Sequence, residues 1–191
     1  QRQMCIRDRL KMSKRKGDYI TMREVIKEVG VDALRFMMIS RNADKTIDFD
    51  FDSLKIKNKD NPVFYVQYAH ARCCSIIKKS KQKDIHPKNI QKNLIDFSLL
   101  STKSERQIIR KLCEWPRVVE QAAYSHEPHR IVFYLYDLAS DIHSHQHEGK
   151  LDEELRVLSS DQTIMRARVV LIEVCQQMIN TGLNILGVTP L

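Results

Sequence analysis

Two lysines flank a methionine and a serine near the start of the chain, in the run Lys11-Met12-Ser13-Lys14. Lysine carries a compact, mobile positive charge, and such charges stabilise the negative charge that gathers on a departing pyrophosphate. With the basic residues and the glycine of 15–17, the run predicts a loop able to close over a nucleoside triphosphate. A basic stretch near a chain terminus is the alternative, because short patterns also arise by chance.

Two short helices in tandem are predicted after this loop. Thr21 and Glu24 have the spacing of a capping box, which starts a helix, and Gly30 is suited to end it. Asp32 lies where the first turn of the next helix begins. The apolar residues of the two helices are Val25, Ile26 and Val29, then Ala33, Leu34, Phe36, Met37 and Met38.

Longer helices follow, according to the spacing of apolar residues. Asn61 is a predicted helix cap with Pro62 at the first position, and the buried stripe of this helix comprises Val63, Val66, Ala69, Cys73 and Ile76. Two shorter helices are expected over 103–112 and 115–124, separated near Pro116. The segment 83–93 is expected to be a surface loop.

The last third of the chain gives the clearest helical periodicity. Glu127 and Pro128 are expected to open a helix whose inward side consists of Ile131, Leu135, Leu138 and Ile142. The final predicted helix has an apolar stripe of Ile164, Ala167, Leu171, Val174, Met178 and Gly182. These patterns predict an all-α fold, a helical bundle preceded by a short segment that holds the basic loop.

Composition agrees with one helical domain plus a small appendage, since the chain has 191 residues and 42% of them are apolar. The five cysteines form no Cys-x-x-Cys pair, so neither a disulfide framework nor a zinc ribbon is indicated. A reducing cytosol is the simplest setting. The sequence shows no uninterrupted apolar stretch near 18 residues, so no membrane span is expected.

A net charge of +8 and an isoelectric point near 9.3 point to a polyanionic partner. The densest basic runs are 55–59 and 78–83. Taken singly, each run is explained at least as well by a solvated surface or by a helix end, where lysines complement the helix dipole.

Three alternating histidines, His143, His145 and His147, invite a metal-binding interpretation, since residues four apart share a helix face. We reject this interpretation because no acidic or cysteine ligand is suitably spaced. No metal site is predicted.

The order of the motifs resembles that of class I aminoacyl-tRNA synthetases. Lys11-Met12-Ser13-Lys14 resembles their Lys-Met-Ser-Lys loop, and 31–36 resembles the Asp-Ala-Leu-Arg element of a family of anticodon-binding domains. The string 60–72 (DNPVFYVQYAHAR) is similar to the arginyl-tRNA synthetase family specifically. The cysteinyl family is the nearest alternative, but it is not expected to show this string. The resemblance covers roughly residues 10–191.

The resemblance implies three parts of the chain. Residues 1–9 do not fit the family and are expected to be a foreign leader without function. Residues 10–52 would hold the signature loop and connecting helices at the end of a catalytic region, and residues 53–191 would form the anticodon-binding bundle. The segment 41–59 would contain the boundary.

The resemblance also implies a reaction, the joining of arginine to tRNA(Arg) through arginyl-adenylate, with ATP as substrate and Mg²⁺ accompanying it. In this reaction Lys14 would stabilise the pyrophosphate end of ATP, while Lys11, Met12 and Ser13 help to shape and close the loop. The protein would be a cytoplasmic monomer that does not bind membranes.

The anticodon-loop contacts implied by the resemblance fall on the helix that begins at Pro62. Tyr65 and Tyr68 share a helix face and could stack on unpaired bases, and Gln67 and Arg72 could add base-edge and phosphate contacts. Tyrosines at the edge of an apolar core are the alternative. The family tends to have an aromatic-rich run where this chain has 145–147 (His-Gln-His), which puts part of the contact set in doubt.

The sequence lacks the nucleotide-binding domain with a histidine signature that class I catalysis requires. We therefore expect a C-terminal fragment that is inactive alone. Two other classes stay open: a stand-alone RNA-binding module, which has no need of the lysine loop, and a structural interaction domain, which needs neither the loop nor a basic surface.

Overall fold

The computed structural model describes residues 21–42, 61–83, 85–87 and 95–191. In these ranges the chain forms six α-helices and two short 3₁₀ turns, with no strand, as predicted for an all-α fold. The elements are α1 (Met22–Val29), α2 (Val31–Ile39), α4 (Pro62–Lys81), η4 (Phe97–Leu99), α5 (Lys103–Tyr124), α6 (His129–Leu151), η5 (Glu153–Leu155) and α7 (Gln162–Leu186).

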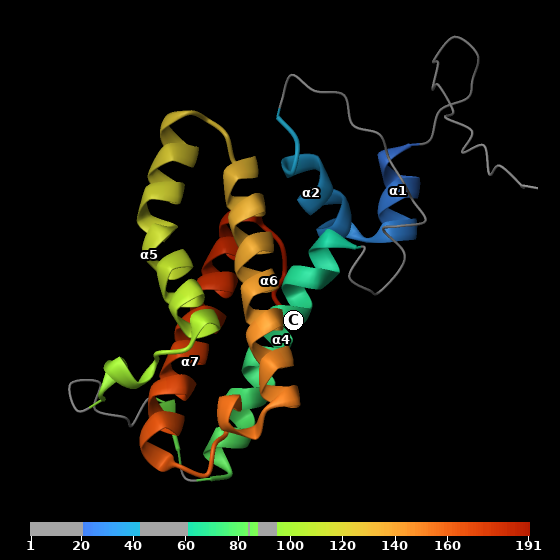
Figure 1. Cartoon of the computed structure of the whole chain (residues 1–191). Helices are drawn as coiled ribbons and strands as arrows, with labels where there is room; N and C mark the ends of the chain where they lie inside the picture. Colours follow the sequence, from blue (N-terminus) through green and yellow to red (C-terminus); the bar gives the residue numbers. More distant parts are fainter. Residues whose placement is uncertain (1–20, 43–60, 84, 88–94) are drawn as a thin grey trace, which may run out of the picture.

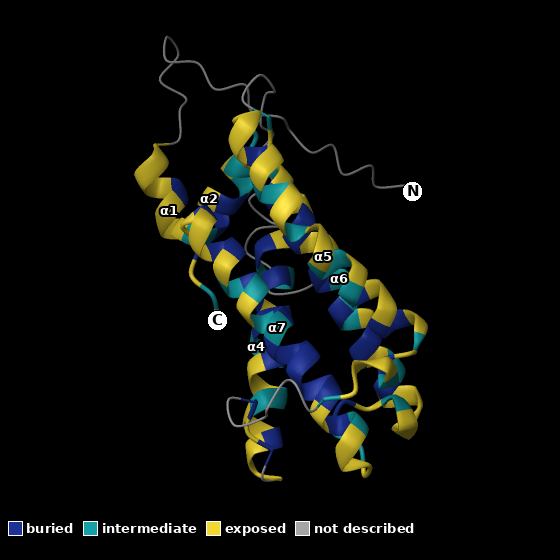
Figure 2. Ribbon diagram, turned by 90° about the vertical axis from the view of Figure 1, so that its left-hand side faces the viewer, coloured by how far each residue is buried: buried dark blue, intermediate teal, exposed yellow. Residues whose placement is uncertain are grey.

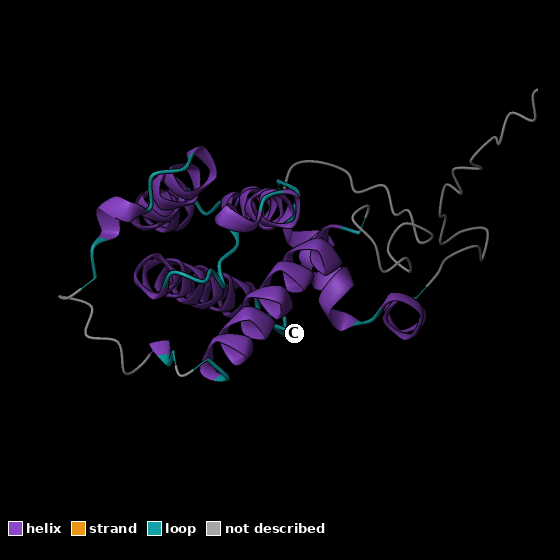
Figure 3. Cartoon of the chain, turned by 60° about the horizontal axis from the view of Figure 1, so that its bottom comes forward, coloured by secondary structure: helices purple, strands orange, loops and turns teal. Residues whose placement is uncertain are grey.

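The long helices α4, α5, α6 and α7 make the bundle (Figure 1). Helix α6 packs between α5 and α4, and α7 packs against both α4 and α6. The short helices α1 and α2 lie beside the N-terminal end of α4, with α1 at the margin of the molecule (Figure 3). Because α2 contacts α4, α6 and α7, the segment that follows the basic loop in sequence is built onto the bundle.

The predicted helix starts are confirmed by their hydrogen bonds. At α1 the Thr21 hydroxyl accepts from the Glu24 backbone N–H, and the Glu24 carboxylate accepts from the Thr21 N–H at 2.7 Å. Gly30, at φ +84°, separates α1 from α2. At α4 the Asn61 side chain accepts from the Phe64 N–H at 3.3 Å, with Pro62 in the first turn.

The predicted core is confirmed for α4 and α6. On α4 the stripe of Val63, Val66, Ala69 and Cys73 is buried, and Ile76 is partly buried against it. On α6 the inward residues are all buried, namely Ile131, Leu135, Leu138 and Ile142. Helix α6 begins at His129, immediately after the predicted opening residues.

Helix α7 is more deeply buried than its predicted stripe implies. Ala167, Leu171 and Gly182 are buried, but the other three stripe residues are half-buried, and the most enclosed residues include Ile172 and Ile179. Contacts with α4, α5, α6 and η4 explain the difference, because they enclose the helix from several sides (Figure 2). By length and composition α7 could cross a membrane, contrary to the sequence expectation, yet 56% of that apolar window is buried within the fold.

The two helices predicted around Pro116 are one, so that prediction is wrong. Helix α5 runs from Lys103 to Tyr124 with Pro116 inside it. Proline has no N–H to donate to the carbonyl four residues earlier, but Pro116 is exposed, so water can replace that partner. Before Pro116, α5 is attached to α6, because the Trp115 ring lies 5.1 Å from that of Tyr134, whose hydroxyl donates to the Lys111 carbonyl at 3.0 Å. After Pro116, Ala122 is buried in the core and Val118 packs against it.

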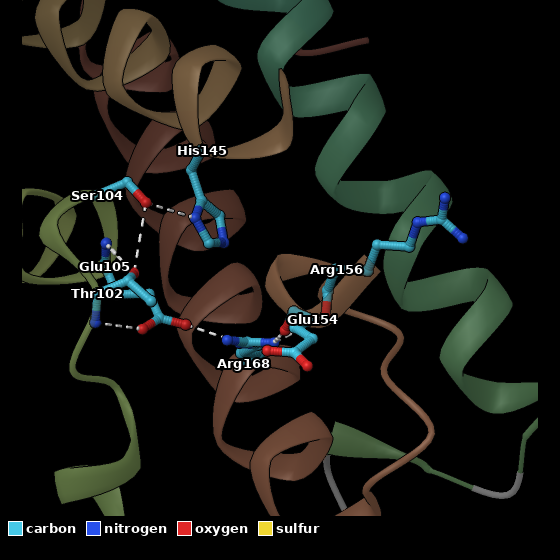
Figure 4. Close-up of polar contacts among 7 residues, drawn as sticks. All are labelled: Thr102, Ser104, Glu105, His145, Glu154, Arg156 and Arg168. Carbon is cyan, nitrogen blue, oxygen red and sulfur yellow. Dashed lines mark hydrogen bonds and ion pairs between the residues drawn. The ribbon is translucent and has the colours of Figure 1, made fainter. Parts of the chain in front are cut away.

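A buried ion pair joins the start of α5 to α7 (Figure 4). The Arg168 Nε donates to Glu105 Oε1 at 2.7 Å, and the two side chains are 3% and 0% exposed. Arg168 Nη1 also donates to the carbonyls of Glu154 and Arg156, at 2.6 and 3.0 Å. The other Glu105 oxygen accepts from the Thr102 N–H as part of a capping box. One cluster therefore fixes α5, η5 and α7 relative to one another.

Several sequence predictions concern residues outside the described ranges. These are the leader 1–9, the loop Lys11-Met12-Ser13-Lys14, the basic run 55–59 and nearly all of the boundary segment 41–59. The predicted surface loop 83–93 is described only in part, and there Ile85 and Pro87 are buried.

Candidate nucleic-acid interface

Aromatic and basic side chains meet where α4 packs on α6. Tyr65, Tyr68 and Arg72 have the spacing i, i+3, i+7 on α4, and Tyr136 and His143 are seven apart on α6. Each set therefore lies along one face of its helix. We call these five residues the aromatic band.

The rings of the band form a continuous series. The Tyr65 ring centroid lies 5.0 Å from that of Tyr136 and 4.6 Å from that of His143. The Tyr68 ring is stacked on His143 at 5.6 Å and on Phe64 at 5.7 Å. These separations are those of ordinary aromatic pairs, so the rings hold one another in place.

His143 links the two helices through both ring nitrogens. Its Nε2 lies 3.2 Å from the Tyr65 carbonyl and its Nδ1 lies 3.2 Å from Arg72 Nη1. Since a carbonyl only accepts and a guanidinium only donates, His143 must be neutral with its proton on Nε2. Burial lowers the pKa of His143, and the nearby Arg72 charge lowers it further, although the Tyr65 carbonyl opposes them.

The rings of the band differ in exposure: Tyr68 and Tyr136 are exposed, whereas Tyr65 is only partly so. Tyr68 is 47% exposed, with the Arg72 guanidinium 5.6 Å from its centroid. Tyr65 is only partly exposed and packs against the core. Tyr68 can therefore accept a stacking partner from outside, whereas Tyr65 mainly supports the rings around it.

Gln67 lies apart from the other three predicted contact residues. Its side chain is buried, and its Nε2 donates to the Thr189 carbonyl at 2.7 Å. The reason is helical geometry, because residue 67 cannot share the face that carries residues 65, 68 and 72. The spacing of residues 65, 67, 68 and 72 in the sequence already indicates this separation.

A pocket of about 540 Å³ adjoins the band between α2, α4 and α6. Tyr136 is part of the aromatic band and also lines the pocket. Most of the lining residues are apolar or aromatic, and Arg41 supplies a positive charge. The lining residues are Ala33, Phe36, Met37, Ser40, Arg41, Pro62, Val63, Val132, Phe133 and Tyr136. The interface therefore combines apolar area, aromatic rings and positive charge.

The three alternating histidines have different surroundings. His143 belongs to the band, and His147 is exposed. His145 is 1% exposed and its Nδ1 lies 3.0 Å from the Ser104 hydroxyl, while burial lowers its pKa. In the described ranges no group of three His, Cys, Asp or Glu side chains is placed to hold a metal. Gln146 is also buried, so only His147 of the run 145–147 faces solvent.

The contact residues predicted from the sequence all lie on α4, so they omit Tyr136 and His143 of α6, which the structure places in the aromatic band. The seven-residue spacing of Tyr136 and His143 matches that of Tyr65 and Arg72, and this repeat could have identified the pair.

Family comparisons match two segments of the chain. Residues 66–191 match the DALR anticodon binding domain, and residues 6–52 match the class I tRNA synthetases (I, L, M and V). The first match spans α5, α6, α7 and most of α4, and thus all of the aromatic band except Tyr65.

Curated relatives extend this similarity over nearly the whole chain. The arginine–tRNA ligase of Roseobacter denitrificans is 45% identical over 180 residues, which cover 94% of this chain and 31% of that protein. The arginine–tRNA ligase of Beijerinckia indica is 45% identical over 183 residues, with the same coverage. The chain thus spans about a third of the length of these relatives.

Solved structures show the same arrangement. The arginyl-tRNA synthetase of Thermus thermophilus is 27% identical with a TM-score of 0.69, over 93% of this chain and 29% of that one. The arginyl-tRNA synthetase of Plasmodium falciparum, at 18% identity and a TM-score of 0.71, covers 86% of this chain and 27% of its own and shows the fold alone.

Proposed function

This chain belongs to the DALR anticodon binding domain family, and from that premise we propose that it is the tRNA-binding part of an arginine–tRNA ligase. The whole enzyme would convert ATP, L-arginine and tRNA(Arg) into arginyl-tRNA(Arg), AMP and diphosphate. The described bundle would hold the anticodon loop, and the segment before it would contribute to the ATP site. The match of residues 6–52 to class I synthetases favours this proposal over a stand-alone RNA-binding module.

The half-exposed Tyr68 ring is the observation that carries the proposal. An anticodon loop offers unpaired bases, and these stack on exposed aromatic rings. Tyr68 is stacked within the protein on Phe64 and His143, and Arg72 lies over the ring. A rigid ring loses little conformational freedom on binding, which favours affinity.

Arg72 would supply the charge at this site. Its guanidinium is oriented by His143 Nδ1, so it can meet a phosphate or a base edge without being ordered first. The net charge of +8 adds a general attraction for RNA that does not depend on base sequence. Tyr65 would support His143, on which the Tyr68 ring is stacked, and Tyr136 would pack against Tyr65. Gln67 would act within the protein.

The loop Lys11-Met12-Ser13-Lys14 would act in the full-length enzyme. Lys14 would stabilise the pyrophosphate end of ATP as negative charge develops there, and Lys11, Met12 and Ser13 would help to shape and close the loop. Mg²⁺ would accompany ATP. We further propose a cytoplasmic, monomeric enzyme, in agreement with the free cysteines of the described ranges.

Anticodon exchange tests the binding proposal. A tRNA(Arg) transcript should bind the chain at least about tenfold more tightly than the same transcript carrying the anticodon of another amino acid, because each misread base costs about 1–3 kcal/mol. Equal affinity for the two transcripts would favour a general RNA-binding module instead. Absence of binding to either would contradict the proposal.

The loop is tested separately in a full-length enzyme that contains these residues. Lys14→Ala should lower arginine-dependent ATP–pyrophosphate exchange by about a hundredfold or more, since one electrostatic contact to the transition state is lost. The affinity for tRNA(Arg) should stay the same. Lys27→Ala, in the exposed last turn of α1, is the control. An unchanged exchange rate in Lys14→Ala would refute the assigned role.

A further inference from the structure

Residues 187–191 lie between α2 and α4 and hydrogen-bond to both. We call them the strap. Val188 is 2% exposed, so the strap is built into the fold. It leaves α7 through Gly187, whose φ of +66° suits a helix end. The Gly187 and Val188 N–H groups donate to the carbonyls of Asn184 and Leu183, at 3.0 and 2.9 Å, which fixes the direction of the exit.

One side of the strap is held by α2. The Arg35 Nε donates to the Leu186 carbonyl at 2.6 Å, where α7 ends and the strap begins. The Thr189 hydroxyl donates to Asp32 Oδ1 at 3.4 Å. A Cβ at position 187 would lie only 2.6 Å from Arg35 Nε, so the glycine also makes room for the guanidinium. Asp32 and Arg35 are three apart and share one face of α2.

The other side of the strap is held by α4. The Gln67 Nε2 donates to the Thr189 carbonyl at 2.7 Å, and His70 Nδ1 donates to the backbone oxygen of Leu191. The Gln176 side chain of α7 donates to His70 Nε2 at 2.7 Å. Gln67 and His70 are both less than 10% exposed. They lie on the opposite side of α4 from Tyr68 and Arg72.

This arrangement matters because apolar packing alone is weakly directional. The apolar part of the contact that α4 makes with α6 and α7, which includes Val63, Val66 and Ala69, would by itself allow small rotations and shifts, and on the α6 side His143 adds hydrogen bonds to α4. Hydrogen bonds with fixed partners specify one rotation of the helix about its axis and one position along that axis. A small rotation of α4 would displace the Tyr68 ring and Arg72 together.

We propose that the strap sets the position of α4 by tying it to α2, so that Asp32, Arg35, Gln67 and His70 are positioning residues for RNA binding. Thr189 connects the two helices, because its hydroxyl donates to Asp32 of α2 and its carbonyl accepts from Gln67 of α4. The positions of α2, which follows the basic loop in the sequence, and of α4, which carries part of the aromatic band, are thereby coupled. The effect on RNA rests on the proposed function, whereas the mechanical link does not.

Amide hydrogen exchange tests the link without RNA. Arg35→Met, which removes the donor to Leu186, should speed exchange of α4 amides about threefold to tenfold, the range expected for one lost hydrogen bond. Arg23→Met on the exposed surface of α1 is the matched control and should leave α4 unchanged. Thr189→Val is a milder second variant should Arg35→Met fold poorly. Unchanged α4 exchange in both variants would overturn the proposal.

RNA affinity separates positioning from simple stabilisation. At a temperature where every variant is fully folded, Arg35→Met and Gln67→Met should each weaken tRNA(Arg) binding about fivefold. The double variant should weaken binding no more than either single variant, because both substitutions interrupt the same connection between α2 and α4. Arg35→Lys, which keeps a donor, should restore most of the affinity. Additive losses of tRNA affinity in the double variant, or variants that lose thermal stability but no affinity, would contradict a positioning role of the strap. If the unaltered chain fails to bind tRNA(Arg), the proposed function fails, while the exchange result still decides the link.

Discussion

Replacing Arg168 by methionine should be among the most damaging single changes in the bundle. Methionine keeps much of the length of the side chain but removes every donor. The Glu105 carboxylate then stays fully buried without its ionic partner, and the carbonyls of Glu154 and Arg156 each lose a hydrogen bond (Figure 4). The loss extends across the contacts among α5, η5 and α7.

The size of the effect follows from this burial. Removing one member of a buried ion pair costs about 3–5 kcal/mol, because an uncompensated charge remains in a medium of low polarity. For a chain of this size that corresponds to a fall in melting temperature of roughly 10 °C. Glu105→Gln combined with Arg168→Met should recover most of the loss, since glutamine at this position can keep the capping box with Thr102.

The pH dependence provides a second, independent check. Burial alone would raise the pKa of Glu105, but hydrogen bonds from Thr102 and Arg168 and the Arg168 charge outweigh it, so the pKa is lowered. In the unaltered protein this contribution is present above the pKa of the unfolded state and is lost as the pH falls through the lower folded value. In Arg168→Met the folded pKa should instead be raised, so protonation relieves the buried charge and the cost of the substitution should shrink from pH 7 to pH 5.

Urea unfolding of both proteins at several pH values is the assay. Arg166→Met, two residues earlier on the exposed side of α7, is the matched control and should change the free energy of unfolding by less than about 0.5 kcal/mol. A cost for Arg168→Met close to that of the control would show that the buried ion pair contributes little to stability. A cost that does not change between pH 7 and pH 5 would contradict the expected rise in the Glu105 pKa.

Three further changes test other parts of the fold. Pro116→Ala should raise the free energy of unfolding by about 1–3 kcal/mol in urea titrations, because an exposed helix interior regains an N–H donor; a loss of stability would contradict a continuous α5. Gly182→Val should lower it by about 1–3 kcal/mol, since even a Cβ would lie 2.6 Å from the buried Leu135 side chain, whereas the exposed neighbour change Thr181→Val should have little effect. Thermal melts should show the stability of the protein falling as the pH drops from 7.5 to 5.5, partly because the lowered pKa of His143 makes the folded state resist protonation of this ring. The stability of His143→Phe should fall less steeply over the same pH range, and an equal slope in the two proteins would exclude a contribution from His143.

Local signals in the sequence were enough to predict where several helices begin and which sides they bury. Thr21 with Glu24, and Asn61 with Pro62, act through bonds within one turn, so their spacing determines the outcome. The inward residues of α4 and α6 followed from the 3.6-residue period alone.

Long-range and context-dependent features could not be predicted in this way. Glu105 and Arg168 are 63 positions apart, and no local pattern pairs them. Pro116 predicts a break because proline usually interrupts a helix, yet α5 is continuous and packs on α6. The family resemblance predicts an RNA contact for Gln67 beside Tyr68, although the Gln67 side chain binds the distant Thr189 carbonyl.

We propose above that the exposed Tyr68 ring contacts an unpaired base of tRNA(Arg). The most direct test compares the dissociation constant of a tRNA(Arg) transcript for Tyr68→Leu with that for Tyr124→Leu, which alters a tyrosine that is 86% exposed at the far end of α5. We expect Tyr68→Leu to weaken binding at least about fivefold, since base–aromatic stacking contributes about 1–3 kcal/mol per base, and Tyr124→Leu to leave it unchanged. Equal affinities for the two variants, with both folded, would contradict the account.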